Sequence, residues 1–388
     1  MDFAEGRPRL PALTSLRFFA ALHVVFFHLL ALKIMWNQGW LKKASSVGYV
    51  GVSFFFVLSG FILVYTYAGR ETTLKDFWSA RFARIYPAYV FSLIVTGPFF
   101  LFAALMLKIP FYEWFGAHLK LVLILVPLLL QAWIPLAALA WNSVAWSLSD
   151  EAFFYFCFPF LQRRVSNFGA VSLASLAAFC WLASMGMTTF YTWKNPDHLT
   201  AIDADVLNAF WLNAVKFHPL ARLPEFLLGM ACGAMFLKSK KNKSHAAPLI
   251  LLGLSICAVV IAFSDRLPYA VLHTSLLAPA FAAIIYGFAL RPHWGALLEW
   301  KPLEFLGDAS YSLYLLHSFI MGPFFYTQTG DPRHRSIGWV CVYLVLAISI
   351  SGLVYRFIEE PARRKLRGKK KTAVLPTLSE PPAQGALA

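Results

Sequence analysis

The sequence repeats one feature along nearly its whole length: apolar runs long enough to cross a lipid bilayer as a helix. About twenty apolar residues span the hydrocarbon core, and eleven such runs occur within 388 residues. They lie near 15–33, 48–67, 85–107, 119–135, 146–162, 168–186, 219–237, 248–264, 270–290, 304–326 and 337–357. Since helices and closed barrels are the structures that satisfy the backbone in lipid, runs of this length predict an all-α, polytopic membrane helix bundle.

Composition agrees with this prediction. Hydrophobic residues make up 59% of the chain and charged residues only 14%, far from the balance of a soluble protein. The five cysteines lie in or beside apolar runs and form no CxxC motif or Cys/His cluster. We interpret them as packing residues and predict neither a disulfide framework nor a metal site.

The net charge of +15 is concentrated at the ends of the apolar runs. Its main clusters are Arg81 with Arg84, Arg163 with Arg164, "KSKKNK" at 238–243 and "RRKLRGKKK" at 363–371. By the positive-inside rule these clusters and both termini are cytoplasmic. Charges in such places anchor and orient spans, so we predict no binding of nucleic acid.

Two cytoplasmic termini require an even number of spans, so one of the eleven runs must fail to cross. The surplus falls within 85–145, a region with five prolines, and proline breaks helices unless neighbours satisfy the freed backbone. We expect about ten transmembrane helices plus one broken or re-entrant segment there. The membrane domain covers 1–365, and 366–388 is expected to be a basic, then disordered, cytoplasmic tail.

The first run, "LTSLRFFAALHVVFFHLL", carries costly ionisable groups. Arg17 and His28 are eleven residues apart, close to three helical turns, which places them on nearly one face about 16 Å apart. A long substrate could bind its anionic end at Arg17 and react near His28. The alternative is a snorkelling arginine and a satisfied bundle histidine. His23, about 140° around the helix from His28, should face elsewhere.

Three later stretches add charged candidates. Arg81 and Arg84 share a helix face and could bind phosphates or simply set topology. In "WNSVAWSLSDEAFFYF", Glu151 is a functional candidate, whereas we expect Asp150 to be an interfacial charge at the outer end of its span. Arg222 and Glu225 lie together in "RLPEFLLGM".

Supporting candidates complete the set. His317 closes the stretch "LGDASYSLYLLH" and lies well inside a span, so we interpret it as a supporting residue rather than a second catalyst. Ser147, near the start of the Glu151 run, is a second supporting candidate. The last run ends on "RFIEEPARR", with Glu359 and Glu360 placed where the helix meets the cytoplasm.

Taken in order, these stretches resemble acyltransferase family 3, whose members include polysaccharide O-acetylases and macrolide O-acyltransferases. The resemblance covers roughly residues 11–365. It is carried by the Arg-x10-His of the first run and by "GVSFFFVLSGFIL", "RFARIYP", "WSLSDEAFFYFCFP", "LPEFLLGM", "YSLYLLH" and "FIEEPAR". Glu151 matches the family glutamate.

The resemblance implies transfer of an acyl group, commonly acetyl, from cytoplasmic acyl-coenzyme A to a hydroxyl of a glycan or glycosylated small molecule. Arg17, Arg81 and Arg84 would bind the donor phosphates, and His28 would act as general base or acyl relay. Glu151 would either orient the imidazole or position the acceptor. No permanently bound cofactor is implied, and the expected location is a bacterial inner membrane.

Two points stay open at this stage. No serine-hydrolase-like domain follows the membrane part of this sequence, so the chain would either complete the transfer itself or pass the acyl group to a separate protein. A transporter or flippase that uses the intramembrane Arg, His and Glu for solute or protons is the alternative function, and it would predict an internal repeat that we do not find. A pH-sensing receptor is a third, weaker alternative.

Overall fold

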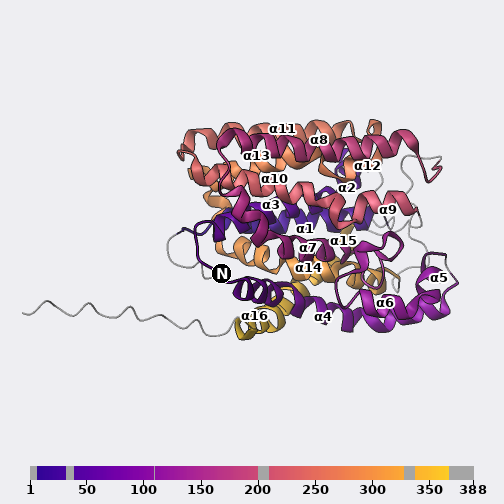
Figure 1. Ribbon diagram of the computed structural model, residues 1–388. Helices are drawn as coiled ribbons and strands as arrows, with labels where there is room; N and C mark the ends of the chain where they lie inside the picture. The colour runs from indigo at the N-terminus through magenta and orange to yellow at the C-terminus, as the bar shows by residue number, and fades with distance from the viewer. Residues whose placement is uncertain (1–6, 32–38, 109, 200–208, 327–336, 367–388) are drawn as a thin grey trace, which may run out of the picture.

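The computed structural model describes residues 7–31, 39–108, 110–199, 209–326 and 337–366, and within these ranges it contains helices and turns but no β-strand. The long helices run side by side in one bundle (Figure 1). The predicted all-α bundle is therefore confirmed.

The α-helices are α1 (Pro11–Ala31), α2 (Gly39–Ser46), α3 (Val50–Tyr67), α4 (Leu74–Met106), α5 (Pro110–Ala117), α6 (Leu119–Leu125), α7 (Trp146–Val165), α8 (Ala170–Lys194), α9 (Phe210–Phe217), α10 (Pro219–Lys238), α11 (Ala246–Ala262), α12 (Tyr269–His273), α13 (Ala278–Ala289), α14 (Lys301–Tyr326), α15 (Ile337–Val354) and α16 (Glu360–Leu366).

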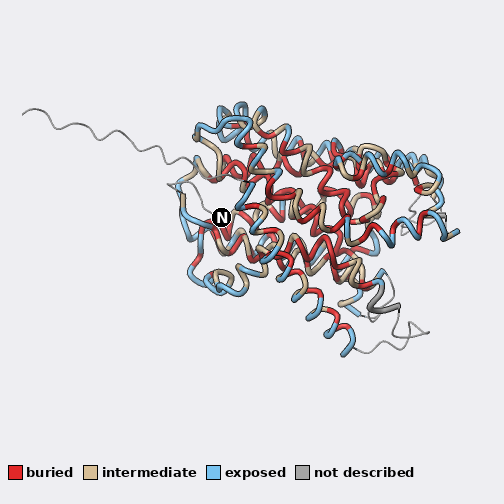
Figure 2. The backbone as a smooth tube through the Cα atoms, turned by 90° about the horizontal axis from the view of Figure 1, so that it is seen from below, coloured by how far each residue is buried: buried red, intermediate tan, exposed pale blue. Residues whose placement is uncertain are grey.

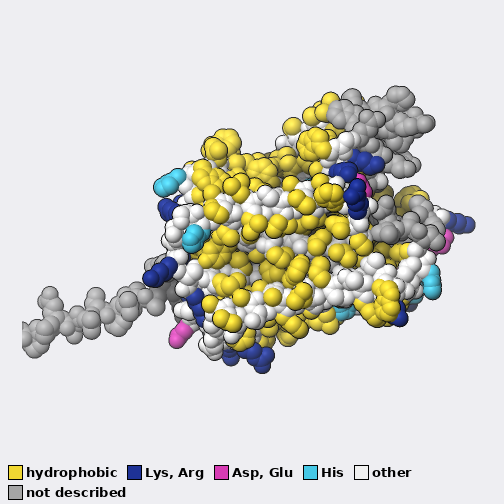
Figure 3. Space-filling view, turned by 90° about the horizontal axis from the view of Figure 1, so that it is seen from above, with side chains coloured by type: hydrophobic (Ala, Val, Ile, Leu, Met, Phe, Trp, Pro, Cys, Tyr) yellow, Lys and Arg dark blue, Asp and Glu magenta, His cyan; other side chains and the backbone are white. Residues whose placement is uncertain are grey.

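Among the described residues, seven helices are long and apolar enough to cross a membrane, and an eighth span arises if the bent pair Ser275–Ala289 and His293–Glu299 is counted as one. α7 and α14 have comparable lengths but carry more polar and charged side chains. Apolar side chains cover the middle of the face in Figure 3, and charged ones gather toward its two ends. The chain is a multi-pass membrane protein.

Burial separates central from peripheral helices. In α3, 72% of the most apolar window is buried, compared with 17% in α8 and in α11. Figure 2 shows this contrast as a buried interior within an exposed outer layer. Exposed apolar residues on α8 and α11 fit contact with lipid, whereas α3 belongs to the packed centre that holds the site.

Glycines allow α3 and α10 to approach closely. A Cβ atom on Gly60 would lie 2.2 Å from the carbonyl oxygen of Phe226, and one on Gly229 would lie 2.1 Å from that of Val57. No larger residue fits at either position without moving the backbone. Small residues at these positions therefore let the two helices pack backbone to backbone.

The surplus run within 85–145 is the one near 119–135. Only α6, seven residues long, forms there, and turns with two short 3-10 helices follow it before α7 begins. Prolines lie in this broken stretch, as expected for residues that cannot donate a backbone hydrogen bond. The prediction of one broken segment in this region is confirmed.

Pro87 and Pro98, in contrast, do not break a helix. Both lie inside α4, which is 33 residues long. Other elements bind carbonyl groups near each proline. The hydroxyl of Tyr311 donates to the carbonyl of Ile85 at 2.8 Å, and the indole of Trp141 donates to that of Leu93 at 3.1 Å. Long-range partners of this kind let a membrane helix tolerate proline.

The described chain begins and ends at the same end of the bundle, where Figure 1 shows the N label and α16. The predicted basic and disordered tail lies almost entirely outside the described residues, so that assignment stays a prediction. The five cysteines are free thiols, and Cys180 and Cys232 are buried among helices as packing residues.

Candidate active site

Five charged or phenolic side chains from three helices form what we call the arginine cluster: Arg17 of α1, Arg81 and Arg84 of α4, and Glu151 and Tyr155 of α7. Arg17 lies within electrostatic range of Arg84, Glu151 and Tyr155. All three arginines predicted to bind the donor therefore come together at one level of the bundle.

Arg84 and Arg81 have different surroundings within the cluster. Arg84 is buried and lies within electrostatic range of three acidic residues, Glu151, Glu359 and Asp308. Arg81 is half-buried, and its guanidinium lies 5.7 Å from the ring centres of both Tyr67 and Tyr155. Its Nε atom is buried and has no hydrogen-bond partner among the described residues. Arg81 is thus packed by aromatic rings but retains unused donor capacity.

Glu151 belongs to this cluster and not to the surroundings of His28. Its carboxylate accepts hydrogen bonds from Ser59 at 3.3 Å and from the hydroxyl of Tyr155. The neighbouring charges are those of Arg17 and Arg84. Of the two roles left open for Glu151, orientation of the His28 imidazole is therefore not supported by the geometry.

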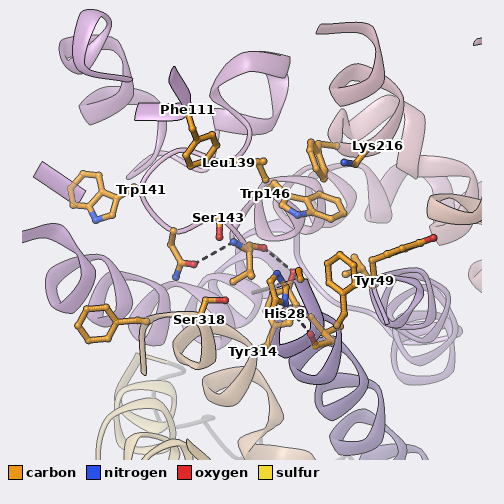
Figure 4. A pocket seen from close by; sticks show the side chains of 18 of the residues that line it. His28, Tyr49, Phe111, Leu139, Trp141, Ser143, Trp146, Lys216, Tyr314 and Ser318 are labelled. Carbon is orange, nitrogen blue, oxygen red and sulfur yellow. Dashed lines mark hydrogen bonds between the residues drawn. The ribbon is translucent and has the colours of Figure 1, made fainter. Parts of the chain in front are cut away.

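A cavity of about 520 Å³, which we call the aromatic cavity, lies farther along the same helices. Its aromatic lining consists of Phe27, Tyr49, Phe99, Phe111, Tyr112, Trp141, Trp146, Phe217, Tyr269, Tyr314 and Phe319. In Figure 4, His28 lies beside Tyr314, with Trp146 and Trp141 on different sides of the cavity. The volume and apolar walls fit a small-molecule site.

The polar part of this lining is basic. His28, Lys216 and His273 line the cavity, and its described lining residues include no Asp or Glu. His273 is buried, stacks on Tyr49 with ring centres 4.7 Å apart, and its Nδ1 has no hydrogen-bond partner in the described part of the chain. The walls therefore offer aromatic faces and cationic or neutral nitrogen groups.

His28 is on the wall of the aromatic cavity, and its imidazole meets that of His317 from α14. The Nδ1 of His28 lies 3.2 Å from the Nε2 of His317 and 2.9 Å from the carbonyl oxygen of Val24. His317 is fully buried. The structure thus places the supporting candidate His317 directly against the catalytic candidate.

His23 faces elsewhere, as its position on the helix predicts. Its Nε2 lies 2.7 Å from the carbonyl oxygen of Ala44 on α2, and His23 is not among the residues that line the cavity. His23 is therefore a suitable control for His28.

Ser147 contacts the cavity wall indirectly, by a hydrogen bond to Tyr314. Its hydroxyl lies 2.8 Å from that of Tyr314, and the tyrosine in turn donates to the carbonyl of Val144 at 2.8 Å. Tyr314 lines the cavity, whereas Ser147 does not. Ser147 therefore fixes a wall residue from behind.

The prediction for Asp150 is wrong. Instead of lying at the interface it is fully buried, with neither carboxylate oxygen hydrogen-bonded in the described part of the chain. Its charged neighbours are Arg222 and Glu225, which form a buried pair at 3.0 Å. Residues of α10 pack beside Asp150, so a position near the start of an apolar run does not mean contact with water.

Glu359 is likewise more buried than a residue at the predicted boundary with the cytoplasm would be. A π-helical turn, Tyr355–Glu359, precedes α16, and Glu359 is fully buried there. Its carboxylate accepts a hydrogen bond from Ser312 at 2.9 Å and lies near Arg84. Such turns redirect side chains inward and occur often at functional sites.

Sequence reasoning missed several residues of the site. Tyr155 follows Glu151 by one helical turn, a spacing that could have identified it. Trp141, Lys216 and His273 had no comparable signal because they come from loops or short helices. Among the described residues, no group of three or more His, Cys, Asp or Glu side chains is placed to hold a metal ion.

The sequence was compared with protein families, with curated proteins and with solved structures. The sequence model of the acyltransferase domain family matches residues 10–356. The acyltransferase MdmB of Streptomyces mycarofaciens is 28% identical, with 95% of each chain covered. The O-acetyltransferase OatA of Staphylococcus aureus is 27% identical over 95% of this chain, which spans 59% of that relative. No solved structure matches.

Proposed function

The chain belongs to this acyltransferase family and is a membrane O-acyltransferase, and from this premise we propose that it moves an acyl group, most simply acetyl, from acyl-coenzyme A to a hydroxyl of a glycan or a glycosylated small molecule. The donor binds at the arginine cluster and the acceptor in the aromatic cavity. The transporter and receptor alternatives gain no support from relatives that are named as acyltransferases.

One observation carries the proposal: the same helices present the arginine cluster and a cavity, with His28 on the wall of the cavity. Arg17 and His28 are eleven residues apart on α1, about 16 Å along the axis. Acyl-coenzyme A has a matching shape, a polyanionic nucleotide joined to a thioester by a long, thin arm. Arginine suits its phosphates because the guanidinium fork matches phosphate geometry.

The aromatic cavity supports an acceptor with a sugar ring. A volume of about 520 Å³ accommodates a small organic molecule or part of a larger one. Trp141 and Trp146 offer flat apolar faces for the C–H face of a pyranose, while His273 and Lys216 supply polar groups. A macrolide sugar and an envelope polysaccharide both fit this description, and the two relatives are named for acyl and O-acetyl transfer.

The transfer needs one proton acceptor at the cavity wall. The acceptor oxygen attacks the thioester carbon and forms the new C–O bond, while its proton passes to Nε2 of His28. The C–S bond then breaks, and the thiolate of coenzyme A takes the proton from the imidazolium. The basic groups near the cavity favour the negative charge that develops on the carbonyl oxygen. Glu151 would hold the arginines in place and would not take part in proton transfer.

The orientation follows from the donor. Acyl-coenzyme A is cytoplasmic, so the end of the bundle with the arginine cluster, the N-terminal residues and α16 would face the cytoplasm, in a bacterial inner membrane. The acceptor would then enter the aromatic cavity from the opposite side. Direct transfer, transfer through an acyl-histidine and delivery to a separate protein remain open mechanistic variants of the same proposal.

Release of coenzyme A by the purified protein in lipid tests the proposal. Acetyl-coenzyme A is supplied with a panel of sugars and macrolides, and the parent is compared with His28→Ala and His23→Ala. We expect acceptor-dependent release that His28→Ala lowers by about a hundredfold or more and that His23→Ala leaves near the parent rate. Equal loss in both variants, or release that no acceptor stimulates, would contradict the proposal.

A further inference from the structure

The two imidazoles on α1 and α14 form a pair whose protons can be assigned from their neighbours. Resting on the proposed function, we propose that His317 is a positioning residue that fixes the proton of His28 on Nδ1, so that Nε2 of His28 is the nitrogen that acts as base. The assignment follows from two backbone carbonyl contacts and one contact between the rings.

The tautomer of His317 is set by its own helix. Its Nδ1 lies 2.8 Å from the carbonyl oxygen of Tyr314 and 3.2 Å from that of Leu313. A carbonyl oxygen only accepts, so Nδ1 of His317 carries the proton and donates. In the neutral ring the lone pair is then on Nε2, which is the atom that faces His28.

The same reasoning applies to His28. Its Nδ1 lies 2.9 Å from the carbonyl oxygen of Val24 and 3.2 Å from Nε2 of His317. Both neighbours are acceptors, so Nδ1 of His28 carries a proton shared between them. The lone pair of His28 is therefore on Nε2, the tautomer that a general base on the cavity wall requires.

The pair is held rigidly because α1 and α14 are in close contact. A Cβ atom on Gly307 would lie only 2.0 Å from the carbonyl oxygen of Thr14, so glycine is needed where the helices meet. His317 is fully buried, and the hydroxyl of Tyr343 on α15 donates to its backbone carbonyl at 3.1 Å. The His317 ring therefore cannot rotate without disturbing this packing, and its contact with His28 orients the second ring.

His317 also has a role during the reaction. When Nε2 of His28 takes the proton of the acceptor hydroxyl, the ring becomes an imidazolium and its Nδ1–H becomes a stronger donor. The lone pair on His317 accepts that stronger hydrogen bond, as a carboxylate does in a Ser-His-Asp triad. Because His317 is neutral, no second charge is buried beside the base. The hydroxyl of Ser318, 3.1 Å from the same Nε2, is the other donor to this lone pair.

Three substitutions of His317 separate this role from simple packing. His317→Gln places an amide oxygen near the former Nε2, so it can still accept from His28. His317→Asn reaches only the former Nδ1 position, and His317→Phe fills the space without an acceptor. We expect kcat to fall by about tenfold to a hundredfold in the Asn and Phe variants and to be largely restored in the Gln variant, with both KM values unchanged.

His23→Gln is the matched control and should leave kcat near that of the parent. The ring of His23 contacts the carbonyl oxygen of Ala44 on α2 and does not line the cavity. Equal losses in the Gln and Asn variants, or higher activity in the Phe variant than in the Gln variant, would overturn the inference. Loss of activity in His28→Ala together with full activity in all three His317 variants would overturn it while leaving the proposed function intact. Loss of His28 dependence would reject the proposed function itself.

A measurement on the parent protein does not depend on how the variants fold. In protein labelled with 15N-histidine and reconstituted in lipid, solid-state NMR distinguishes protonated from unprotonated ring nitrogens. We expect Nδ1 to be protonated and Nε2 unprotonated in both His28 and His317 at neutral pH. A protonated Nε2 in either ring would overturn the inference.

Discussion

The arginine cluster and the aromatic cavity are built on the same helices but by opposite means. α1 carries Arg17 at one level and His28 at the other, and α4 carries Arg84 and then Thr96. α7 runs the other way, from Trp146 to Tyr155. In each helix about ten residues, or about 15 Å, separate the two levels.

The difference lies in how each region satisfies its polar groups. In the cluster, arginines lie within electrostatic range of carboxylates, as Arg84 does of Glu359, Glu151 and Asp308. In the cavity, aromatic rings form the walls. Polar wall groups are held by hydrogen bonds to residues outside the cavity, as the hydroxyl of Tyr314 is held by Ser147. Paired charges suit a polyanionic donor, whereas rigid aromatic walls suit a ring-shaped acceptor, so substitutions should affect the two substrates separately.

The largest effect on stability should come from removing Arg222, whose side chain bonds the backbone of the cavity residue His273. Arg222→Met removes the buried pair with Glu225 and the hydrogen bond to the carbonyl of His273, so we expect a loss of about 3–5 kcal/mol in the free energy of unfolding. Thermal unfolding in detergent measures it. The double variant Arg222→Met/Glu225→Met should lose less than the single variant, and an equal or larger loss would contradict the idea of an uncompensated buried charge.

Arg81→Gln tests the donor side. Loss of a charged donor to phosphate should raise the KM for acyl-coenzyme A by about tenfold to a hundredfold and leave the KM for the acceptor unchanged. Arg163→Gln is the control, because Arg163 is an exposed arginine in the last turn of α7. A change in the acceptor KM of similar size would show that the two regions are not separate.

Gly307→Ala tests the close contact of α1 with α14, which lies near Arg17, about 15 Å along α14 from His317. The new methyl group would clash with the carbonyl of Thr14, so we expect a loss of about 1–3 kcal/mol in unfolding free energy and a lower kcat. Gly186→Ala is the matched control, because a Cβ at Gly186 meets no atom within 4 Å. An unchanged kcat in a folded Gly307→Ala protein would contradict the role given to this contact.

Trp141→Leu should have the smallest effect and should act on the acceptor alone. Trp141 stacks on Phe100 with ring centres 5.3 Å apart and presents its indole to the cavity. Losing one aromatic face should raise the acceptor KM by about tenfold at most. Trp193→Leu, at an exposed tryptophan of α8, is the control and should change neither KM.

The spans could be predicted from sequence because each depends on a local run of apolar residues. The run near 337–357 became α15, and the run near 119–135 formed only the short helix α6, in the region where a broken segment was predicted. Local patterning also placed Arg17 and His28 correctly, since both lie on one helix.

What could not be predicted depends on contacts between distant segments. His28 and His317 are 289 positions apart, and no periodicity links them. Asp150 looked interfacial because its own run begins there, but residues of α10 pack beside it. Pro87 and Pro98 looked like helix breakers because Tyr311 and Trp141, which bind carbonyls near them, are far away in sequence.

The contact between α1 and α14 also sets the order of events during synthesis. His28 is made within the first thirty residues, but its partner belongs to a helix that begins at Lys301. A ribosome-bound chain that has inserted its first helices therefore has a cationic cluster still lacking Glu359 and a base without its neighbour. Under the proposed function, a chain that ends before α14 lacks the neighbour of His28, so full activity is expected only after nearly the whole chain has entered the membrane.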